Sequence, residues 1–387
     1  MSESRFDAAV IGGGLAGRAA AITVARAGLH TVHLAPAGPL DRRTSALMMP
    51  TVAYLQEIGV VADPAATGQP LRQIRIIDAT GRLIRAPETL FDSRDAGLDA
   101  FGWNFPNVAL AAALETVAAG LANLTTLPKA VSSMQFGDDG ARLTLGDGAI
   151  IEAALSVGAD GKNSLVRGAA GIPVREHKFD QAALVCDLQL GRPLDGQSVE
   201  FHYNQGPFTL VPAGGTRANL VWIDERSRLE QVKDGGPEAL PAALRAQSMG
   251  LFGEIVPLTP AFIFPLSTLA VAKAGGNGVV LVGEAAHAFP PIGAQGLNLG
   301  LRDVADLGAA LAGVKADEEG WARQASEDYA RRRAGDLTRT GATVDALFRS
   351  LLAEMLPAQV LRAGGLWALK LLPGLRRQAT KIGLGGR

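Results

Sequence analysis

The spacing of apolar residues near the N-terminus predicts a strand, a helix and a second strand. Residues 6–11 form a short apolar run that is typical of a buried strand, and residues 15–27 have the alanine-rich pattern of a helix that ends at Gly28. Residues 31–35, which include Val32, Leu34 and Ala35, predict the second strand. This order is typical of the first βαβ unit of a parallel sheet.

The middle of the chain has a different pattern. Short apolar runs separated by Gly, Pro and Asn turns predict an antiparallel sheet at residues 183–190, 198–203, 208–212 and 219–224. Helical spacing at residues 107–121 precedes this region, and a predicted buried strand at 278–282 follows it. A turn at 283–296 and a helix at 297–312 come next. The sequence therefore predicts an α/β protein in which a β-rich region is inserted between nucleotide-binding elements.

Composition limits the classes of protein. A length of 387 residues with 48% hydrophobic and 19% charged residues indicates a globular chain of about two to three domains. The net charge of −1 gives no field that would attract nucleic acid, so no nucleic-acid partner is predicted. Cys186 is the single cysteine, which excludes an internal disulfide and favours a cytoplasmic protein. The five histidines lack metal-ligand spacing, so no metal is predicted.

The C-terminal part of the chain is basic and apolar. No run of about 18 uncharged apolar residues is present in the chain, so no membrane-spanning helix is predicted. A basic apolar helix at 351–387 is compatible with a peripheral position on an anionic membrane or with contact to a biosynthetic complex. Packing against its own domain is the alternative. From residue 355 onward the segment has no acid, and its basic residues are Arg362, Lys370, Arg376, Arg377, Lys381 and Arg387.

The strongest local motif is the glycine pattern that follows the first strand. Gly12 permits a tight turn, Gly14 lets the backbone approach a pyrophosphate, and Gly17 lets the helix pack closely on the strand. The helix N-terminus then offers free amides to the phosphates. A glycine turn without a ligand is the alternative. The acid that usually binds a ribose hydroxyl is missing, because Ala35 occupies its position and the next acid is Asp41.

Two further segments identify the nucleotide. Residues 156–167 read SVGADGKNSLVR, and residues 282–303 read VGEAAHAFPPIGAQGLNLGLRD. Together with the glycine motif, they resemble the three motifs of class A flavin monooxygenases, the aromatic hydroxylases of the para-hydroxybenzoate hydroxylase fold. The chain is similar in particular to the ubiquinone-biosynthesis hydroxylases, with matches also at Arg43-Thr44, Pro106-Asn107, Gly206-Pro207 and Phe264-Pro265-Leu266. The resemblance covers nearly the whole chain.

The resemblance implies a Rossmann-type FAD-binding domain, an inserted antiparallel β-sheet substrate domain and a C-terminal helical segment. The FAD-binding domain is predicted at residues 1–72, 101–180 and 271–350, and the substrate domain at 73–100 and 181–270. The cofactor is FAD, reduced by NAD(P)H or by a protein electron donor. The residues that the resemblance assigns to FAD are Gly12, Gly14, Leu15, Ala16, Gly17, Arg43, Asn107, Val131, Asp160, Gly283, Glu284, Pro291, Gly293, Gln295, Gly296, Leu297 and Asn298.

Several of these assignments have alternatives. Asp160 also fits a helix cap. Glu284 stands where the family usually has aspartate, so its carboxylate lies one methylene further out. Arg43 also fits a surface charge, and Val131 a core residue. No catalytic residue is identified, because the flavin supplies most of the chemistry; Pro291 and His287 are flavin-adjacent candidates, and His287 equally fits a structural histidine.

The resemblance implies that O2 and a flavin C4a-hydroperoxide hydroxylate a lipophilic aromatic substrate, a polyprenylated phenol of ubiquinone biosynthesis. Apolar residues of the inserted sheet are predicted to form the pocket wall, although they equally fit a core: Phe208, Leu210, Trp222 and Phe264. A prenyl reductase or halogenase on the same fold is one alternative, although the halogenase segment Trp-x-Trp-x-Ile-Pro is missing. A non-catalytic accessory subunit is the other.

Overall fold

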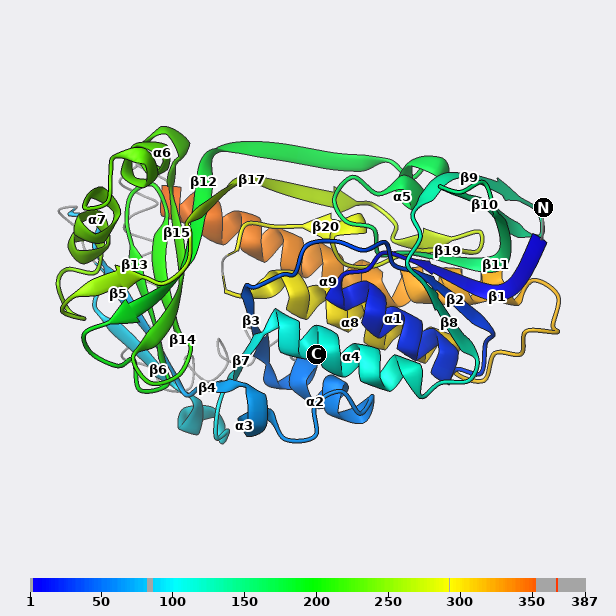
Figure 1. The fold of residues 1–387 in the computed structure, drawn as a ribbon, viewed down its shortest axis with the longest axis horizontal. Helices are drawn as coiled ribbons and strands as arrows, with labels where there is room; N and C mark the ends of the chain where they lie inside the picture. Colours follow the sequence, from blue (N-terminus) through cyan, green and yellow to red (C-terminus); the bar gives the residue numbers. More distant parts are fainter. Residues whose placement is uncertain (1–2, 82–85, 292, 353–366, 368–387) are drawn as a thin grey trace.

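The computed structural model describes residues 3–81, 86–291, 293–352 and 367. Nearly all of the predicted C-terminal segment, and residue 292 of the late turn, lie outside these residues. Figure 1 shows two sheets at opposite ends of an elongated molecule, joined by two long strands and by a layer of helices. Among the described residues, no helix is long and apolar enough to cross a membrane.

The first sheet carries the nucleotide-binding elements. Strands β19, β11, β1, β2 and β8 lie side by side in this order and run parallel, and a β9–β10 hairpin extends from β11. The strands are β1 (Glu3–Ile11), β2 (Thr31–Leu34), β8 (Leu124–Leu127), β9 (Val131–Gly137), β10 (Gly140–Leu145), β11 (Ile150–Gly158), β18 (Gly275–Gly276) and β19 (Val279–Leu281). All four residues of β2 are buried, including the polar residues Thr31 and His33, as expected for a strand inside a parallel sheet.

Helices pack on this sheet and on one another. Helix α1 contacts both α4 and α8, and α8 contacts α9. Ala19, Ala20 and Ala21 of α1 are completely buried, and their small side chains allow close packing. The helices of this layer are α1 (Leu15–Arg26), α4 (Asn107–Ala119), α5 (Leu165–Ala169), α8 (Gln295–Leu311) and α9 (Trp321–Leu352).

The second sheet is mostly antiparallel and has the order β20-β17-β12-β15-β14-β13-β5-β6, with β16 paired to β12. Its strands are β5 (Gln73–Asp78), β6 (Thr89–Asp92), β12 (Val174–Leu190), β13 (Gln197–His202), β14 (Pro207–Pro212), β15 (Arg217–Glu225), β16 (Ile255–Pro257), β17 (Phe262–Val271) and β20 (His287–Ala288). Helices α6 (Arg226–Asp234) and α7 (Ala239–Gln247) contribute Leu229 and Leu244 to the core on one face. The opposite face is called the inner face below.

A small sheet connects the two parts. It consists of β3 (Thr44–Met48), β7 (Gly102–Pro106) and β4 (Gln69–Leu71), with α2 (Met49–Glu57) and α3 (Pro64–Thr67) beside it. Asn219 of β15 accepts hydrogen bonds from Thr44 and from Asn104, each at 2.8 Å. These bonds show that the inner face of the second sheet is directed toward the nucleotide-binding part.

The structure confirms the predicted α/β architecture with its inserted antiparallel sheet. The predicted strands and helices are present, and most of their ends fall within a few residues of the expected positions. Among the predicted elements, strand β12 differs most, because it begins at Val174, before the predicted start at 183. Its first half is mostly exposed and therefore lacks the apolar pattern of a buried strand.

Candidate functional site

Three motif turns lie at the same edge of the first sheet. Gly12 follows β1, Asp160 lies two residues after β11, and Gly283 lies two residues after β19. These strands are parallel neighbours, so their carboxyl ends meet. In open parallel sheets, ligands bind at this edge. The fold therefore brings together segments that are far apart in the sequence.

The three glycines of the first motif have different surroundings. A Cβ on Gly12 would lie 2.1 Å from the carbonyl oxygen of Ala159, and a Cβ on Gly17 would lie 2.1 Å from that of Gly12. Gly14 is exposed, and a Cβ there would meet nothing within 4 Å. Gly14 is also the N-cap of α1, and no side chain caps this helix. Gly12 and Gly17 thus allow close packing, while Gly14 leaves the helix amides open to a ligand.

The Asp160 turn is held by side chains. Oδ2 of Asp160 accepts hydrogen bonds from the amides of Leu165 (2.7 Å) and Val166 (3.2 Å), and the hydroxyl of Ser164 accepts one from the amide of Arg167. The helix-cap interpretation of Asp160 is therefore correct for one oxygen. The other oxygen, Oδ1, is buried and has no hydrogen-bond partner. A buried acceptor of this kind has capacity for a further donor.

Arg167 joins the second motif to the third. This buried side chain donates to the carbonyl oxygens of Ala285 (2.8 Å) and Lys162 (2.7 Å). Sequence inspection did not select Arg167 as a site residue, because its role depends on an approach between two distant segments.

Glu284 is exposed between the buried residues Gly283 and Ala285. Gly283 has φ +58, a left-handed conformation that favours glycine. A Cβ on Gly283 would lie 3.5 Å from Cβ of Ala16, so this turn lies against the start of α1. His287 is buried and lies 2.6 Å from Oδ2 of Asp303. These contacts favour the structural interpretation of His287.

The N-terminus of α8 follows the late turn. Its N-cap is Ala294, and no side chain caps the helix. Pro291, Gly293 and Gly296 are exposed, so the amides at this end are accessible. Asn298, which lies within the first turn, is buried and bonded to protein groups on both sides.

Arg43 and Asn107 share one partner. The guanidinium of Arg43 donates to both oxygens of Asp41 at 2.8 and 2.9 Å, and the amide of Asn107 donates to Oδ2 of Asp41 at 2.8 Å. The hydrogen bonds that Arg43 donates to Asp41, together with a smaller electrostatic contribution from Glu284, raise the pKa of Arg43.

For three of the four predicted substrate residues the structure favours the alternative of an ordinary core. Phe208, Leu210 and Trp222 are 0%, 0% and 1% exposed, and they belong to the core that includes Leu229 and Leu244 of α6 and α7. Alternation along the strands places them on the face that is directed away from the nucleotide-binding part. Their apolar character therefore reflects an ordinary core.

Phe264 lies on the inner face. It is 42% exposed, and its ring centroid lies 5.8 Å from the guanidinium carbon of Arg43. Its strand partner Ala183 faces the same side, as does Ile223 on the next strand. These residues alternate with the core-facing residues, so the alternation in the sequence separates the two faces but does not say which face meets the nucleotide-binding part.

Val131 is partly buried and Cys186 is buried. Val131 is the first residue of β9 and is partly buried, so the structure leaves its contact with adenine a prediction. Cys186 is buried on β12, and its burial raises its pKa to about 12, as expected for a core thiol.

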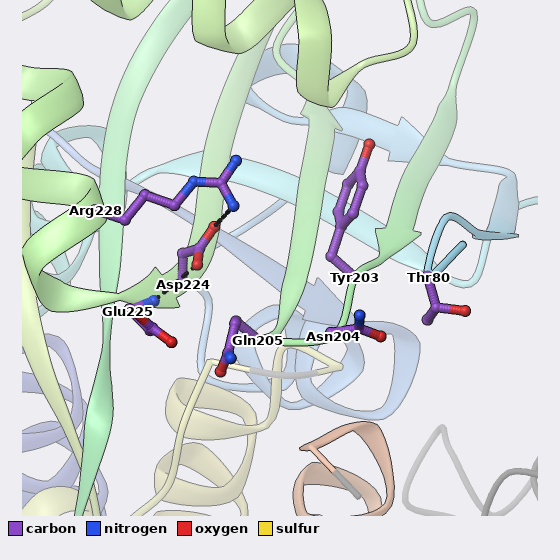
Figure 2. Close-up of a pocket in the computed structure, with 7 residues that line it drawn as sticks. All are labelled: Thr80, Tyr203, Asn204, Gln205, Asp224, Glu225 and Arg228. Carbon is purple, nitrogen blue, oxygen red and sulfur yellow. Dashed lines mark hydrogen bonds and ion pairs between the residues drawn. The ribbon is translucent and has the colours of Figure 1, made fainter. Parts of the chain in front are cut away.

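A pocket of about 330 Å³ lies elsewhere on the second sheet (Figure 2). Arg228 lies 3.2 Å from the buried Asp224, and burial raises the pKa of that carboxyl group. None of the predicted site residues lines this pocket. Its lining residues are Thr80, Tyr203, Asn204, Gln205, Asp224, Glu225 and Arg228.

The residues at the sheet edge fit FAD. The open amides at Gly14 suit a pyrophosphate, the exposed carboxylate of Glu284 suits a hydroxyl group, and the uncapped start of α8 suits an electron-rich ring. Among the described residues, no cluster of His, Cys, Asp and Glu has the geometry of a metal site.

Comparisons with known proteins agree with this chemistry. Residues 5–339 match the family model described as FAD binding domain. The ubiquinone hydroxylase UbiL of Rhodospirillum rubrum is 31% identical over 98% of this chain and 89% of its own length. The 3-demethoxyubiquinol 3-hydroxylase of Escherichia coli is 28% identical over 100% of both chains.

Solved structures show the same fold. The p-nitrophenol 4-monooxygenase PnpA of Pseudomonas putida superposes with a TM-score of 0.80, at 18% identity, over 100% of both chains. PqsL of Pseudomonas aeruginosa, described as a probable FAD-dependent monooxygenase, has a TM-score of 0.79 at 21% identity, over 94% of this chain and 100% of its own. With the match to the FAD-binding model and the similarity to UbiL, these findings show that this chain belongs to the family of FAD-dependent aromatic monooxygenases that includes the ubiquinone hydroxylases.

Proposed function

We propose that this FAD-dependent monooxygenase hydroxylates the ring of a polyprenylated phenol in ubiquinone biosynthesis. The observation that carries the proposal is the meeting of the three motif turns at one sheet edge. The exposed ring of Phe264, whose centroid lies 5.8 Å from the guanidinium carbon of Arg43, supports it. The substrate class is supported by the relatives, which are named for ubiquinone or its precursor. Bound FAD would pass two electrons from the donor to O2 and so supply the activated oxygen atom.

The proposed roles of the protein groups follow from their positions. The amides at the start of α1 bind the pyrophosphate, and Glu284 accepts a hydrogen bond from a ribityl hydroxyl. The amides at the start of α8 face the pyrimidine end of the flavin ring, where negative charge collects on reduction. Arg43 and Asn107 both donate hydrogen bonds to Asp41, and they thereby hold the segment of protein chain beside the cofactor.

The inner face of the second sheet completes the proposed substrate site. Phe264 offers apolar surface for a lipophilic ring, and its ring helps to exclude water from the reacting atoms. Binding there orients the ring, which is the main contribution that this chain makes to the reaction. No acid–base dyad is needed for this role.

The C-terminal segment is proposed to bind the membrane surface and so to give the enzyme access to its lipid-borne substrate. Its six basic residues and its apolar residues suit the surface of an anionic membrane. The electron donor is proposed to be NAD(P)H, which approaches the flavin near Asp160.

The test uses the purified protein with FAD, NADPH, isotopically labelled dioxygen and prenylated phenols of several tail lengths. Mass spectrometry should detect a product that contains one labelled oxygen atom, and the rate should fall when the tail is removed. Flavin oxidation that is equally fast without any phenol, with no labelled product, would contradict the proposal. Deleting the gene should lead to accumulation of the unhydroxylated quinone precursor.

A further inference from the structure

Arg333 is a fully buried guanidinium outside the three motifs. It lies on α9 and is 0% exposed. Three carboxylates surround it, with nitrogen–oxygen distances of 2.7 Å to Asp303, 2.8 Å to Asp306 and 2.7 Å to Asp336. Burying a charge without partners is strongly unfavourable, so this arginine and its carboxylates depend on one another.

Asp303 divides its two oxygens between α9 and the third motif. Oδ1 faces Arg333, while Oδ2 accepts a hydrogen bond from the amide of Gly283 at 2.8 Å and lies 2.6 Å from Nε2 of His287. One carboxylate therefore holds both ends of the turn from Gly283 to His287. Glu284 is the exposed residue within that turn.

A second contact from the same helix supports the turn. Tyr329 lies four residues before Arg333, and its hydroxyl donates to the carbonyl oxygen of Leu281 at 2.7 Å. Leu281 is the last residue of β19, immediately before the motif. Helix α9 thus fixes the end of the strand through Tyr329 and the following turn through the pair Arg333–Asp303.

We propose that Arg333 is a positioning residue for the flavin: through Asp303 it holds the Gly283–His287 turn so that Glu284 faces the ribityl chain of FAD. The proposal rests on the role given to Glu284 under Proposed function. Arg333 lies on α9, outside the three motifs, so the flavin site extends beyond the motif residues. Arg333 itself touches neither substrate nor cofactor.

The test compares two ligands that reach different parts of the site. FAD spans the glycine turn and the Gly283 turn, whereas ADP is expected to bind the glycine turn alone. Arg333→Lys keeps a positive charge, but an ammonium group cannot match the fork of a guanidinium among three carboxylates. We expect about tenfold weaker FAD binding, as for the loss of one well-formed hydrogen bond, and unchanged ADP binding.

The control is Arg332→Lys. Arg332 is the neighbouring residue on α9, its side chain is 39% exposed, and it pairs with Asp328. FAD and ADP should both bind this variant as they bind the wild type. If the affinities for both ligands fall together in Arg333→Lys, or if neither falls, the positioning role is wrong.

Two further variants keep the test decisive. Asp303→Asn retains an oxygen for the Gly283 amide but loses its charge, and it should reproduce the selective loss of FAD affinity if Arg333→Lys does not fold. Glu284→Gln combined with Arg333→Lys should weaken FAD binding by less than the product of the single effects, because both act through one turn. Fully multiplicative effects would overturn the link to Glu284. Failure of the wild type to bind FAD would instead contradict the proposed function.

Discussion

Asn298 of α8 accepts a hydrogen bond from the amide of Met48 at 2.8 Å, and so joins the late flavin motif to strand β3. Its amide nitrogen also donates to the carbonyl oxygens of Ala46 (2.8 Å) and Ala294 (2.6 Å). Asn298 therefore fixes the start of α8 against the strand that follows Arg43.

Asn298→Asp should weaken FAD binding and reduce the free energy of unfolding by about 1–3 kcal/mol, because both donors are lost at a buried position. Titration with FAD and denaturant unfolding of the apoprotein measure the two effects. Unchanged FAD affinity would show that this bridge is not needed by the flavin site.

Gly14 and Gly17 should respond differently to the same substitution. Gly14→Ala adds a methyl group where nothing lies within 4 Å, so the apoprotein should keep its stability while FAD binding weakens. Gly17→Ala places the methyl group 2.1 Å from the carbonyl oxygen of Gly12 and should lower the apoprotein melting temperature. Equal FAD affinity of Gly14→Ala and the wild type would argue against a pyrophosphate at this turn.

Ala294 adopts a left-handed conformation, with φ 55 and ψ 30. This conformation costs a residue with a Cβ about 1–2 kcal/mol. Ala294→Gly removes that strain, but glycine increases the conformational entropy of the unfolded chain. This increase lowers the free energy of unfolding by about 0.4–1 kcal/mol. We expect a small net gain in the free energy of unfolding, measured by urea denaturation; Ala294→Val should lose stability.

Cys186 should make stability depend on alkaline pH. Burial raises the pKa of its thiol to about 12 in the folded protein, compared with about 8.5 in an unfolded chain. Between these values the unfolded state binds fewer protons, so the free energy of unfolding should fall by up to about 1.4 kcal/mol per pH unit.

The Cys186→Ala variant isolates this contribution, because the cavity that it creates costs the same free energy at every pH. Its unfolding free energy should decline less steeply than that of the wild type as the pH rises above about 8.5. Parallel pH profiles of the two proteins would mean that the thiol is not protected in the folded state.

Phe264 and Trp222 lie on opposite faces of the second sheet, so their alanine variants should have different effects. Phe264→Ala should raise KM for the phenol with little loss of stability, because its ring is 42% exposed on the inner face. Trp222→Ala should destabilise the fold by about 3–5 kcal/mol, since its ring is completely buried. Steady-state kinetics and thermal unfolding of both variants measure the contrast, and an unaltered KM in Phe264→Ala would remove Phe264 from the substrate site.

The sequence alone determined the local elements and the family. The alanine-rich helix after β1 and the alternating strands of the second sheet follow from apolar spacing, which local burial imposes on each element. The motif glycines were recognisable because Gly12 and Gly17 have no space for a side chain. The helix and strand patterns depend on neighbouring residues in the chain, whereas the close approach that Gly12 permits is to Ala159 in a distant segment.

The tertiary structure decided what depends on contact between distant segments. It placed Trp222 in the core and Phe264 on the inner face, although both are apolar strand residues, because periodicity does not say which face of a sheet meets which domain. It also paired Arg333 with Asp303, which lie on different helices. Their proposed role at the flavin site depends on the packing of α9 on α8, and no local pattern encodes that contact.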